Sequence, residues 1–258
     1  MSTLDLSPAP GAARLRRMVV AHAYVEVRLL LRNGEQLVLA LALPLLVLVA
    51  GDSTGGLLDL GPGRRIDVLA PGVLALAVLS TSFTSLAIAT GFERRYGVLK
   101  RLGATPLPRH GLLAGKVLAV LVVEALQVLV VGAVAMALGW APVGGVVAVL
   151  GGTLLVLLGT AAFGALGLAM AGSLRAEATL ALANLVYVLL LVAGAVVVPL
   201  GRYPEAVQPL VALLPSGALA QGLRDLSAGA GLPWAACLVL VGWAAAGTGL
   251  AARTFRWE

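Results

Sequence analysis

Six long apolar segments separate the charged parts of this sequence, and they constrain its fold more than any other feature. A helix needs about 20 mainly apolar residues to cross the hydrocarbon core of a bilayer. Apolar residues make up 60% of the chain and charged residues only 12%, which is too little polarity to cover a water-soluble surface. Composition therefore excludes a soluble enzyme, a disordered tail and a nucleic-acid-binding module. We expect an all-α polytopic membrane protein with six transmembrane helices, at about 36–50, 68–90, 111–138, 143–171, 179–200 and 233–252.

The first apolar segment, 36–50, is the shortest and contains Pro44. Its length resembles the apolar part of a signal peptide. About 35 residues precede it, however, and no small-residue cleavage site follows. We therefore expect an uncleaved span and two regions, an amino-terminal region 1–35 and a transmembrane domain 36–258.

Basic residues are distributed unevenly between the two sides of the predicted membrane. If the amino terminus is cytoplasmic, 14 of the 18 Lys and Arg residues fall in inside segments and 4 in outside segments. Short cytoplasmic loops carry an excess of Lys and Arg in membrane proteins. This distribution predicts that both termini face the cytoplasm.

Residues 12–35 have the pattern of an amphipathic helix. Plotted at 100° per residue, basic side chains share one side, and an apolar stripe lies on another, interrupted by His22 and Glu26. A basic amphipathic helix binds anionic lipid headgroups while its apolar face enters the interface. We expect an interfacial helix; the alternative is a juxtamembrane helix with no membrane role. The basic side is Arg14, Arg17, Arg28 and Arg32, with Tyr24, and the apolar stripe is Leu15, Met18, Val19, Val25 and Leu29.

The loop between the second and third spans, 91–110, is both charged and apolar-faced. Six basic groups lie between Arg94 and Lys116, against the single acid Glu93. Apolar residues recur every third position, at Tyr96, Leu99 and Leu102, before Gly103 and two prolines end the pattern. This pattern predicts a short helix that docks on a protein partner. The alternative is that the charge only sets the topology.

Polar residues inside the apolar segments are few. Glu124 lies near the middle of the third span, with Gln127 one turn later, and Asn184 lies in the fifth. A charge at the bilayer centre costs about 2.5–3.5 kcal/mol on insertion scales, so Glu124 should face other helices or a water-filled path. These three residues are candidates for a translocation path; the alternative is a hydrogen-bonded packing contact.

The predicted outside segment 201–232 contains two moderately apolar runs separated by Pro215, Ser216 and Gly217, with Arg224 in the second run. Two short helices broken at Pro215 are expected to enter the membrane and return. Non-helical backbone at that depth is tolerated only where protein or a cavity covers it. An ordinary external loop is the alternative.

Motifs for catalysis in the chain itself are missing from the sequence. The string closest to a phosphate-binding loop, GLLAGK at 111–116, is one residue short and is followed by Val117 instead of Ser or Thr. Two histidines and one cysteine do not suggest a metal site. We therefore predict no catalytic residues, no metal and no cofactor in this chain.

Two stretches carry a family resemblance. Phe92–Arg109 reads FERRYGVLKRLGATPLPR and resembles the cytoplasmic loop of type-2 ABC transporter permeases. Leu214–Leu226 reads LPSGALAQGLRDL and looks like the second signature of that family. Six spans and a basic amphipathic amino-terminal helix also match, and bacterial drug and antibiotic exporters look most similar.

The resemblance implies that the chain works with an ATPase subunit outside the membrane. A separate ABC ATPase, present in two copies, would bind ATP and Mg and dock on the coupling helix in the loop. A second permease subunit, identical or related, would complete the transporter in the plasma membrane. Residues 12–33 would form the connecting helix, and the re-entrant segment would include Pro215, Ser216 and Arg224. The coupling-helix residues would be Glu93, Arg94, Arg95, Tyr96, Gly97, Leu99, Lys100, Arg101 and Leu102.

The expected function is ATP-driven export of a hydrophobic or amphipathic substrate, such as a drug-like molecule or a lipid. A lipid-linked glycan exporter permease of the same family is an alternative. An ion-coupled secondary transporter is another, although no clear internal repeat supports it. A membrane protein that regulates another protein without transport is a third.

Overall fold

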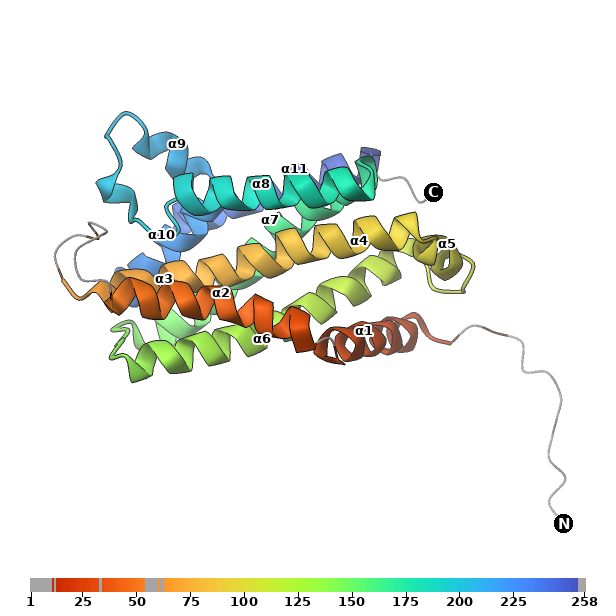
Figure 1. Cartoon of the computed structure of the whole chain (residues 1–258), viewed down its shortest axis with the longest axis horizontal. Helices are drawn as coiled ribbons and strands as arrows, with labels where there is room; N and C mark the ends of the chain where they lie inside the picture. The colour runs from red at the N-terminus through yellow and green to blue at the C-terminus, as the bar shows by residue number, and fades with distance from the viewer. Residues whose placement is uncertain (1–10, 12, 33, 54–59, 61–62, 255–258) are drawn as a thin grey trace, which may run out of the picture.

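The computed structural model describes residues 11, 13–32, 34–53, 60 and 63–254 as an elongated bundle of helices (Figure 1). Every regular element in these ranges is a helix, which confirms the predicted all-α class. The elements, in chain order, are α1 (Leu15–Arg32), α2 (Gly34–Ser53), α3 (Arg65–Val78), the π-helix η1 (Leu79–Ser85), α4 (Leu86–Arg95), α5 (Val98–Gly103), α6 (Arg109–Ala137), α7 (Gly145–Ser173), α8 (Ala176–Ala193), the 3₁₀ turn η2 (Leu200–Arg202), α9 (Gln208–Leu213), α10 (Pro215–Ser227) and α11 (Trp234–Thr254).

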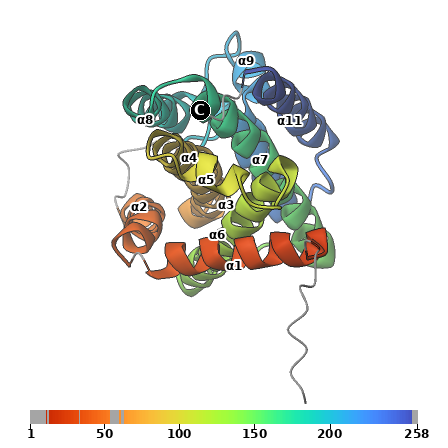
Figure 2. The same ribbon diagram turned by 90° about the vertical axis from the view of Figure 1, so that its right-hand side faces the viewer.

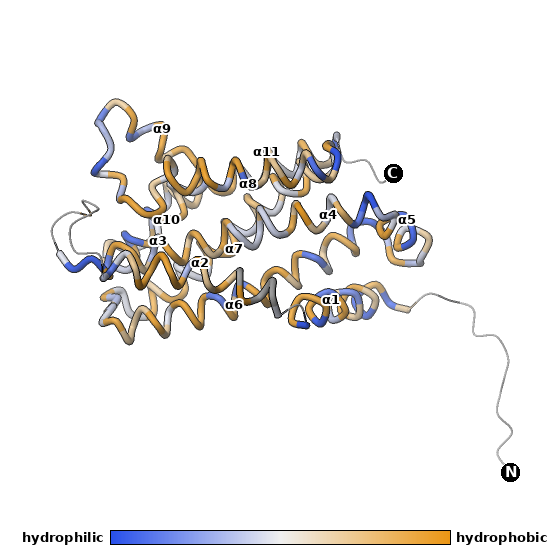
Figure 3. Tube along the Cα trace, in the orientation of Figure 1, coloured by the Kyte–Doolittle hydropathy of each residue, from blue (hydrophilic) through white to orange (hydrophobic). Residues whose placement is uncertain are grey.

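Five helical runs in the described part of the chain are long and apolar enough to cross a membrane. They are Arg65–Arg95, which joins α3, η1 and α4, and the helices α6, α7, α8 and α11. Within α2, Ala40–Ser53 is a shorter apolar stretch, so the first predicted span, 36–50, stays a prediction. Figure 3 shows hydrophobic residues along the bundle and more hydrophilic residues at its two ends and on α1. The chain is a polytopic helical membrane protein.

The predicted fifth span, 179–200, is wrong at its carboxyl end. Helix α8 stops at Ala193, and the next residues run without regular structure to Pro199. Gly194 lies so close to α10 that a Cβ there would be 2.1 Å from the Ser216 Oγ atom. Ala195 then has a φ of +53°, which a continuing right-handed helix does not allow. The close approach of α10 therefore ends the helix, and the apolar run of the sequence did not reveal this.

The two ends of the bundle differ. One end, here called the α5 end, carries α5 together with α1 and the last turns of α11 (Figure 1). The other, here called the α10 end, carries α9, α10 and the start of α3. Helix α1 lies across the bundle while the long helices run along it (Figure 2). This crosswise position fits the helix expected to lie along a membrane surface.

Glycines on α6 explain how α1 approaches the bundle. A Cβ on Gly115 would be 2.5 Å from the His22 Cδ2 atom, and one on Gly111 would be 3.2 Å from the Leu15 Cδ1 atom. The small-residue pair, four positions apart, therefore lets α1 lie directly on the α6 backbone. Helices in membranes commonly use small residues in this way.

Candidate functional site

The loop between α4 and α5 turns sharply at Gly97. Helix α4 ends at Arg95, and Gly97 adopts a φ of +70°, the left-handed conformation that glycine tolerates best. Helix α5 then begins at Val98 and ends at Gly103, before the two prolines. The single short helix predicted over this stretch is thus two helices separated by a turn at Tyr96 and Gly97.

This turn also divides the predicted apolar stripe. Tyr96 lies in the turn and is 65% exposed, whereas Leu99 is 1% exposed and Leu102 is half-buried. Leu99 therefore anchors α5 to the bundle and does not present a docking surface, which corrects the expectation for this residue. Three of the exposed residues at this end, Tyr96, Lys100 and Arg101, lie in the turn and on α5, and we name them the loop head.

The geometry at Gly97 predicts a graded effect of substitution. A Cβ at this position meets open space, so only the backbone conformation restricts it. We expect Gly97→Val to destabilise the turn by about 1–2 kcal/mol, because a β-branched residue disfavours a positive φ. Gly97→Asn should be nearly neutral, because Asn adopts this conformation far more readily. Thermal melting of the purified variants in detergent checks this; equal melting temperatures for Val and Asn would contradict it.

Two arginines predicted to bind a partner also hold α4 to its neighbours. The Arg94 guanidinium donates hydrogen bonds to the carbonyl oxygens of Gly172 and Leu174, at the end of α7. Arg95 forms an ion pair with Glu177 in the first turn of α8. The α4–α5 turn is thereby attached to the junction of α7 and α8.

A buried cluster of charges attaches the same turn to α1 and α6. The Lys116 side chain is 3% exposed, and its Nζ atom lies 2.6 Å from the Glu93 Oε1 atom and 2.9 Å from the Glu26 Oε1 atom. The Nε2 atom of His22 lies 3.5 Å from the same Glu26 oxygen. Burial lowers the pKa of His22, while Glu26 opposes the shift. Glu93, expected to face a partner, instead points into the chain.

This cluster was missed in the sequence for a specific reason. In the sequence Lys116 is one of several charges in and near the loop, and Glu26 and His22 interrupt the apolar face of an amphipathic helix. A lysine one turn inside an apolar span, and an acid on the apolar face of α1, each signal a buried partner. Their distance along the sequence hid the fact that they meet.

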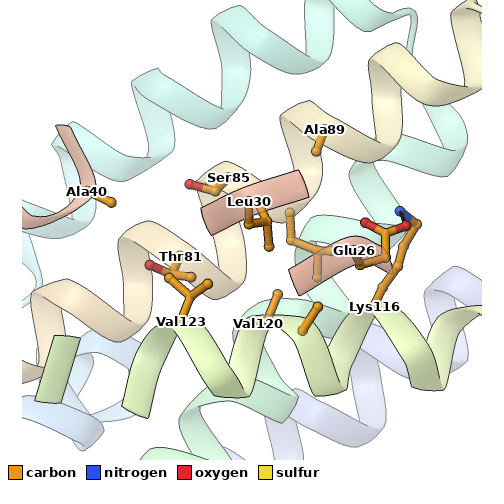
Figure 4. Close-up of a pocket in the computed structure, with 11 residues that line it drawn as sticks. Glu26, Leu30, Ala40, Thr81, Ser85, Ala89, Lys116, Val120 and Val123 are labelled. Atoms are coloured by element: carbon orange, nitrogen blue, oxygen red, sulfur yellow. Dashed lines mark hydrogen bonds and ion pairs between the residues drawn. The ribbon is translucent and has the colours of Figure 1, made fainter. Parts of the chain in front are cut away.

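A small cavity continues from the charge cluster toward the middle of the bundle. It has a volume of about 60 Å³ and lies between α1, α2, α6 and the η1–α4 segment. Figure 4 shows Glu26 and Lys116 at one side of it and Thr81 and Ser85 at the other. Both hydroxyl residues belong to η1, and π-helical turns are frequent at functional sites.

Glu124 and Gln127 are both 1% exposed but bind different neighbours. Glu124 accepts a hydrogen bond of 2.5 Å from the Thr160 hydroxyl of α7. The Gln127 amide oxygen accepts one of 2.7 Å from Thr81, and its nitrogen donates to the Ala40 carbonyl. These two residues therefore link α6 to three other elements at mid-bundle.

Asn184 does not join this group. It is exposed on the outer side of α8, where its side chain donates to the carbonyl oxygen of Leu180 one turn earlier. The structure thus separates the three path candidates, with two inside the chain and one outside.

At the α10 end, the two short helices expected around Pro215 are present. Leu214 separates α9 from α10, and Pro215 occupies the first turn of α10. Most of α10 is buried, including Ser216 at 1% exposure, because it packs against α3, α7 and α11. Helix α9 is more exposed. This burial favours a segment that enters the bundle, and its depth in a membrane stays a prediction.

Arg224 holds the broken backbone after α8. Its side chain is buried, and it donates hydrogen bonds to the carbonyl oxygens of Val68, Ala195 and Val196 at 3.1, 2.7 and 2.5 Å. The last two carbonyls belong to the irregular stretch that follows α8. One side chain therefore connects α10, α3 and the end of α8.

These features define the class of protein. It is a helical membrane protein in which ion pairs and arginine hydrogen bonds connect the helix before the loop head, α4, to α1, α6, α7 and α8. A model of the ABC-2 family transporter proteins matches residues 65–253. The chain belongs to the ABC-2 transporter family, and it is a permease subunit of an ABC transporter. No curated protein matches the chain.

Proposed function

We propose that this chain is the membrane-spanning subunit of an exporter driven by ATP hydrolysis in separate ATPase subunits. In this proposal the α5 end faces the cytoplasm, together with both termini, in the plasma membrane. Two ATPase subunits bind ATP and Mg, and a second permease subunit completes the transporter. The cargo is a hydrophobic or amphipathic molecule.

The observation that carries the proposal is the way in which the loop head is attached. Tyr96, Lys100 and Arg101 point outward, while the residues just before them are fixed to the bundle. Glu93 reaches α6 and α1 through Lys116, and Arg94 reaches the end of α7. A force applied to the loop head therefore passes to several helices at once. Family membership supplies the ATPase as the source of that force.

Coupling requires that the ATPase bind the loop head differently in its two nucleotide states. The exposed aromatic ring and the two cations suit an acidic, partly apolar cleft. Two neighbours contact the Tyr96 ring. The Arg95 guanidinium lies 5.9 Å from the ring centre, and the Phe92 ring stacks on it. The Tyr96 ring is thus held in place before binding, which reduces the ordering that binding requires of this side chain.

The loop head gives the test of this function. We expect the variant Tyr96→Ala, Lys100→Glu, Arg101→Glu to abolish cargo-stimulated ATP hydrolysis in proteoliposomes, while membrane insertion and the melting temperature stay unchanged. The measurement uses the chain co-expressed with ABC ATPases of its own genome. Arg253→Glu, which reverses an exposed charge near the end of α11, is the matched control and should keep activity. Full stimulation in the loop-head variant, or cargo movement driven by an ion gradient without ATPase, would contradict the proposal.

A further inference from the structure

A large groove runs along one side of the bundle, away from the charge cluster. Its volume is about 1090 Å³, and residues of α3, α6, α7 and α10 line it. This is at or above the usual range of ligand cavities, about 300–1,000 Å³. Several wall residues are widely exposed, among them Leu129 and Val149, so the groove opens to the outside of the chain.

The walls of the groove are almost wholly apolar. The exceptions that carry oxygen-bearing side chains are Glu124, Thr153 and Ser227, and the indole of Trp140 adds a nitrogen. Thr153 donates its hydroxyl to the Val149 carbonyl, and Ser227 donates to the Arg224 carbonyl. Both hydroxyl protons are therefore already used within their own helices. Glu124 is the acidic group among the lining residues, and none of those residues is Lys, Arg or His.

One oxygen of Glu124 is unused. The Oε2 atom accepts the hydrogen bond from Thr160, but the Oε1 atom is buried and has no hydrogen-bond partner in the described part of the chain. A buried carboxyl group that has an oxygen without a partner is costly, and native proteins rarely leave a buried polar atom unsatisfied. The wall therefore holds a carboxyl oxygen that is left without a partner inside the chain.

We propose that this groove binds an amphipathic organic cation, whose ammonium group pairs with the free oxygen of Glu124 while its apolar body lies along α6 and α7. The ion pair supplies the countercharge that the chain itself does not place there. An apolar body is required because the rest of the wall is almost wholly apolar. Binding stands on the groove alone; the inference that the bound cation is the cargo rests on the proposed function.

The experiment compares two probes that share one apolar body: diphenylhexatriene, and the same molecule carrying a cationic trimethylammonium group. The full chain is purified in nanodiscs of a zwitterionic lipid, and saturable binding is measured with empty nanodiscs as background. We expect the cationic probe to bind at least about 10-fold more tightly than the uncharged one, which corresponds to a single favourable ion pair of about 1.4 kcal/mol. The cation should also compete with itself when added unlabelled in excess.

Three variants locate the site. Glu124→Gln keeps the shape and the contact to Thr160 and should reduce the preference for the cation to about one. Glu124→Asp keeps the charge and should retain a preference. Thr153→Val, on the same wall, is the matched control and should leave the preference unchanged. Melting temperatures verify that each variant is folded. If a variant does not fold, the ratio of the wild-type affinities for the cationic and the uncharged probe still decides the question.

Equal binding of both probes to the wild type would overturn the inference and would assign the groove to uncharged chains such as those of lipids. A preference that survives Glu124→Gln would overturn it as well. The ATPase assay separates this inference from the proposed function. Cation binding without any effect on a partner ATPase leaves the site in place and removes the exporter role. ATP-driven transport in a complex that shows no charge preference keeps the exporter role and removes the cation site.

Discussion

Replacing Lys116 by Met is expected to lower the free energy of unfolding by about 3–5 kcal/mol, the usual cost of removing one partner from a buried ion pair. Lys116 separates two carboxylates, Glu26 and Glu93, and contacts both within hydrogen-bonding distance. Without it, two acids face each other in a site with little access to water. The melting temperature of the purified chain in detergent measures the effect, and ATP-driven transport should be lost with it.

A control and a rescue distinguish a local effect from a general one. Lys100→Met removes an exposed lysine at the same end and should change the melting temperature little. Combining Lys116→Met with Glu26→Gln and Glu93→Gln removes all the charges together and should restore much of the stability. If the triple variant regains stability but not transport, the cluster carries motion from the loop head. An unchanged melting temperature in Lys116→Met alone would show that the three charges do not meet.

The second large effect is expected at Arg224. Replacing it by Leu leaves the carbonyls of Ala195 and Val196 without their donor in a buried place. Each unsatisfied buried group costs about 1–3 kcal/mol, so the loss of stability should reach at least about 2 kcal/mol. Arg224→Lys should rescue only part of it, because one ammonium group lacks the planar fork that reaches all three carbonyl oxygens.

The control for this substitution is Arg253→Leu, which removes an exposed arginine from α11 and should be neutral. An additional variant tests the geometry. A Cβ on Gly72 would lie 2.1 Å from the Val196 oxygen and 2.7 Å from the Arg224 Nη2 atom, so Gly72→Ala should weaken the same site. Stability unaffected by both Arg224→Leu and Gly72→Ala would contradict the assigned bonds.

The sequence was sufficient to predict the class of fold and most of the long helices. An apolar run of about 20 residues is a local property, and the cost of burying backbone polar groups in lipid makes a helix the natural outcome. The break at Pro215 was predictable for a similar reason, because proline cannot continue a preceding helix. The carboxyl end of α8 was not predictable, since it depends on the approach of Ser216 to Gly194 from a segment 22 positions later.

The candidate site shows the same division. The loop head was found because a basic, Gly- and Pro-bounded segment is visible in the sequence. Its attachments were not found, because Glu93, Arg94 and Lys116 carry the same charges whether they face a partner or the chain. The regular spacing of Tyr96, Leu99 and Leu102 suggested one surface, but the left-handed turn at Gly97 sends these residues to different places. Periodicity holds only as far as the helix is continuous.

The position of the loop head relative to the membrane is the most direct test of the account. Lys100→Cys in a Cys237→Ala background gives one thiol, at an exposed position of α5. The native Cys237, which is removed, is buried. A membrane-impermeant maleimide is applied to intact cells and to inverted membrane vesicles. We expect labelling only in inverted vesicles, with protection when the ATPase is bound. Labelling of this cysteine in intact cells would place the loop head outside the cell, where no ATPase can reach it, and would contradict the account.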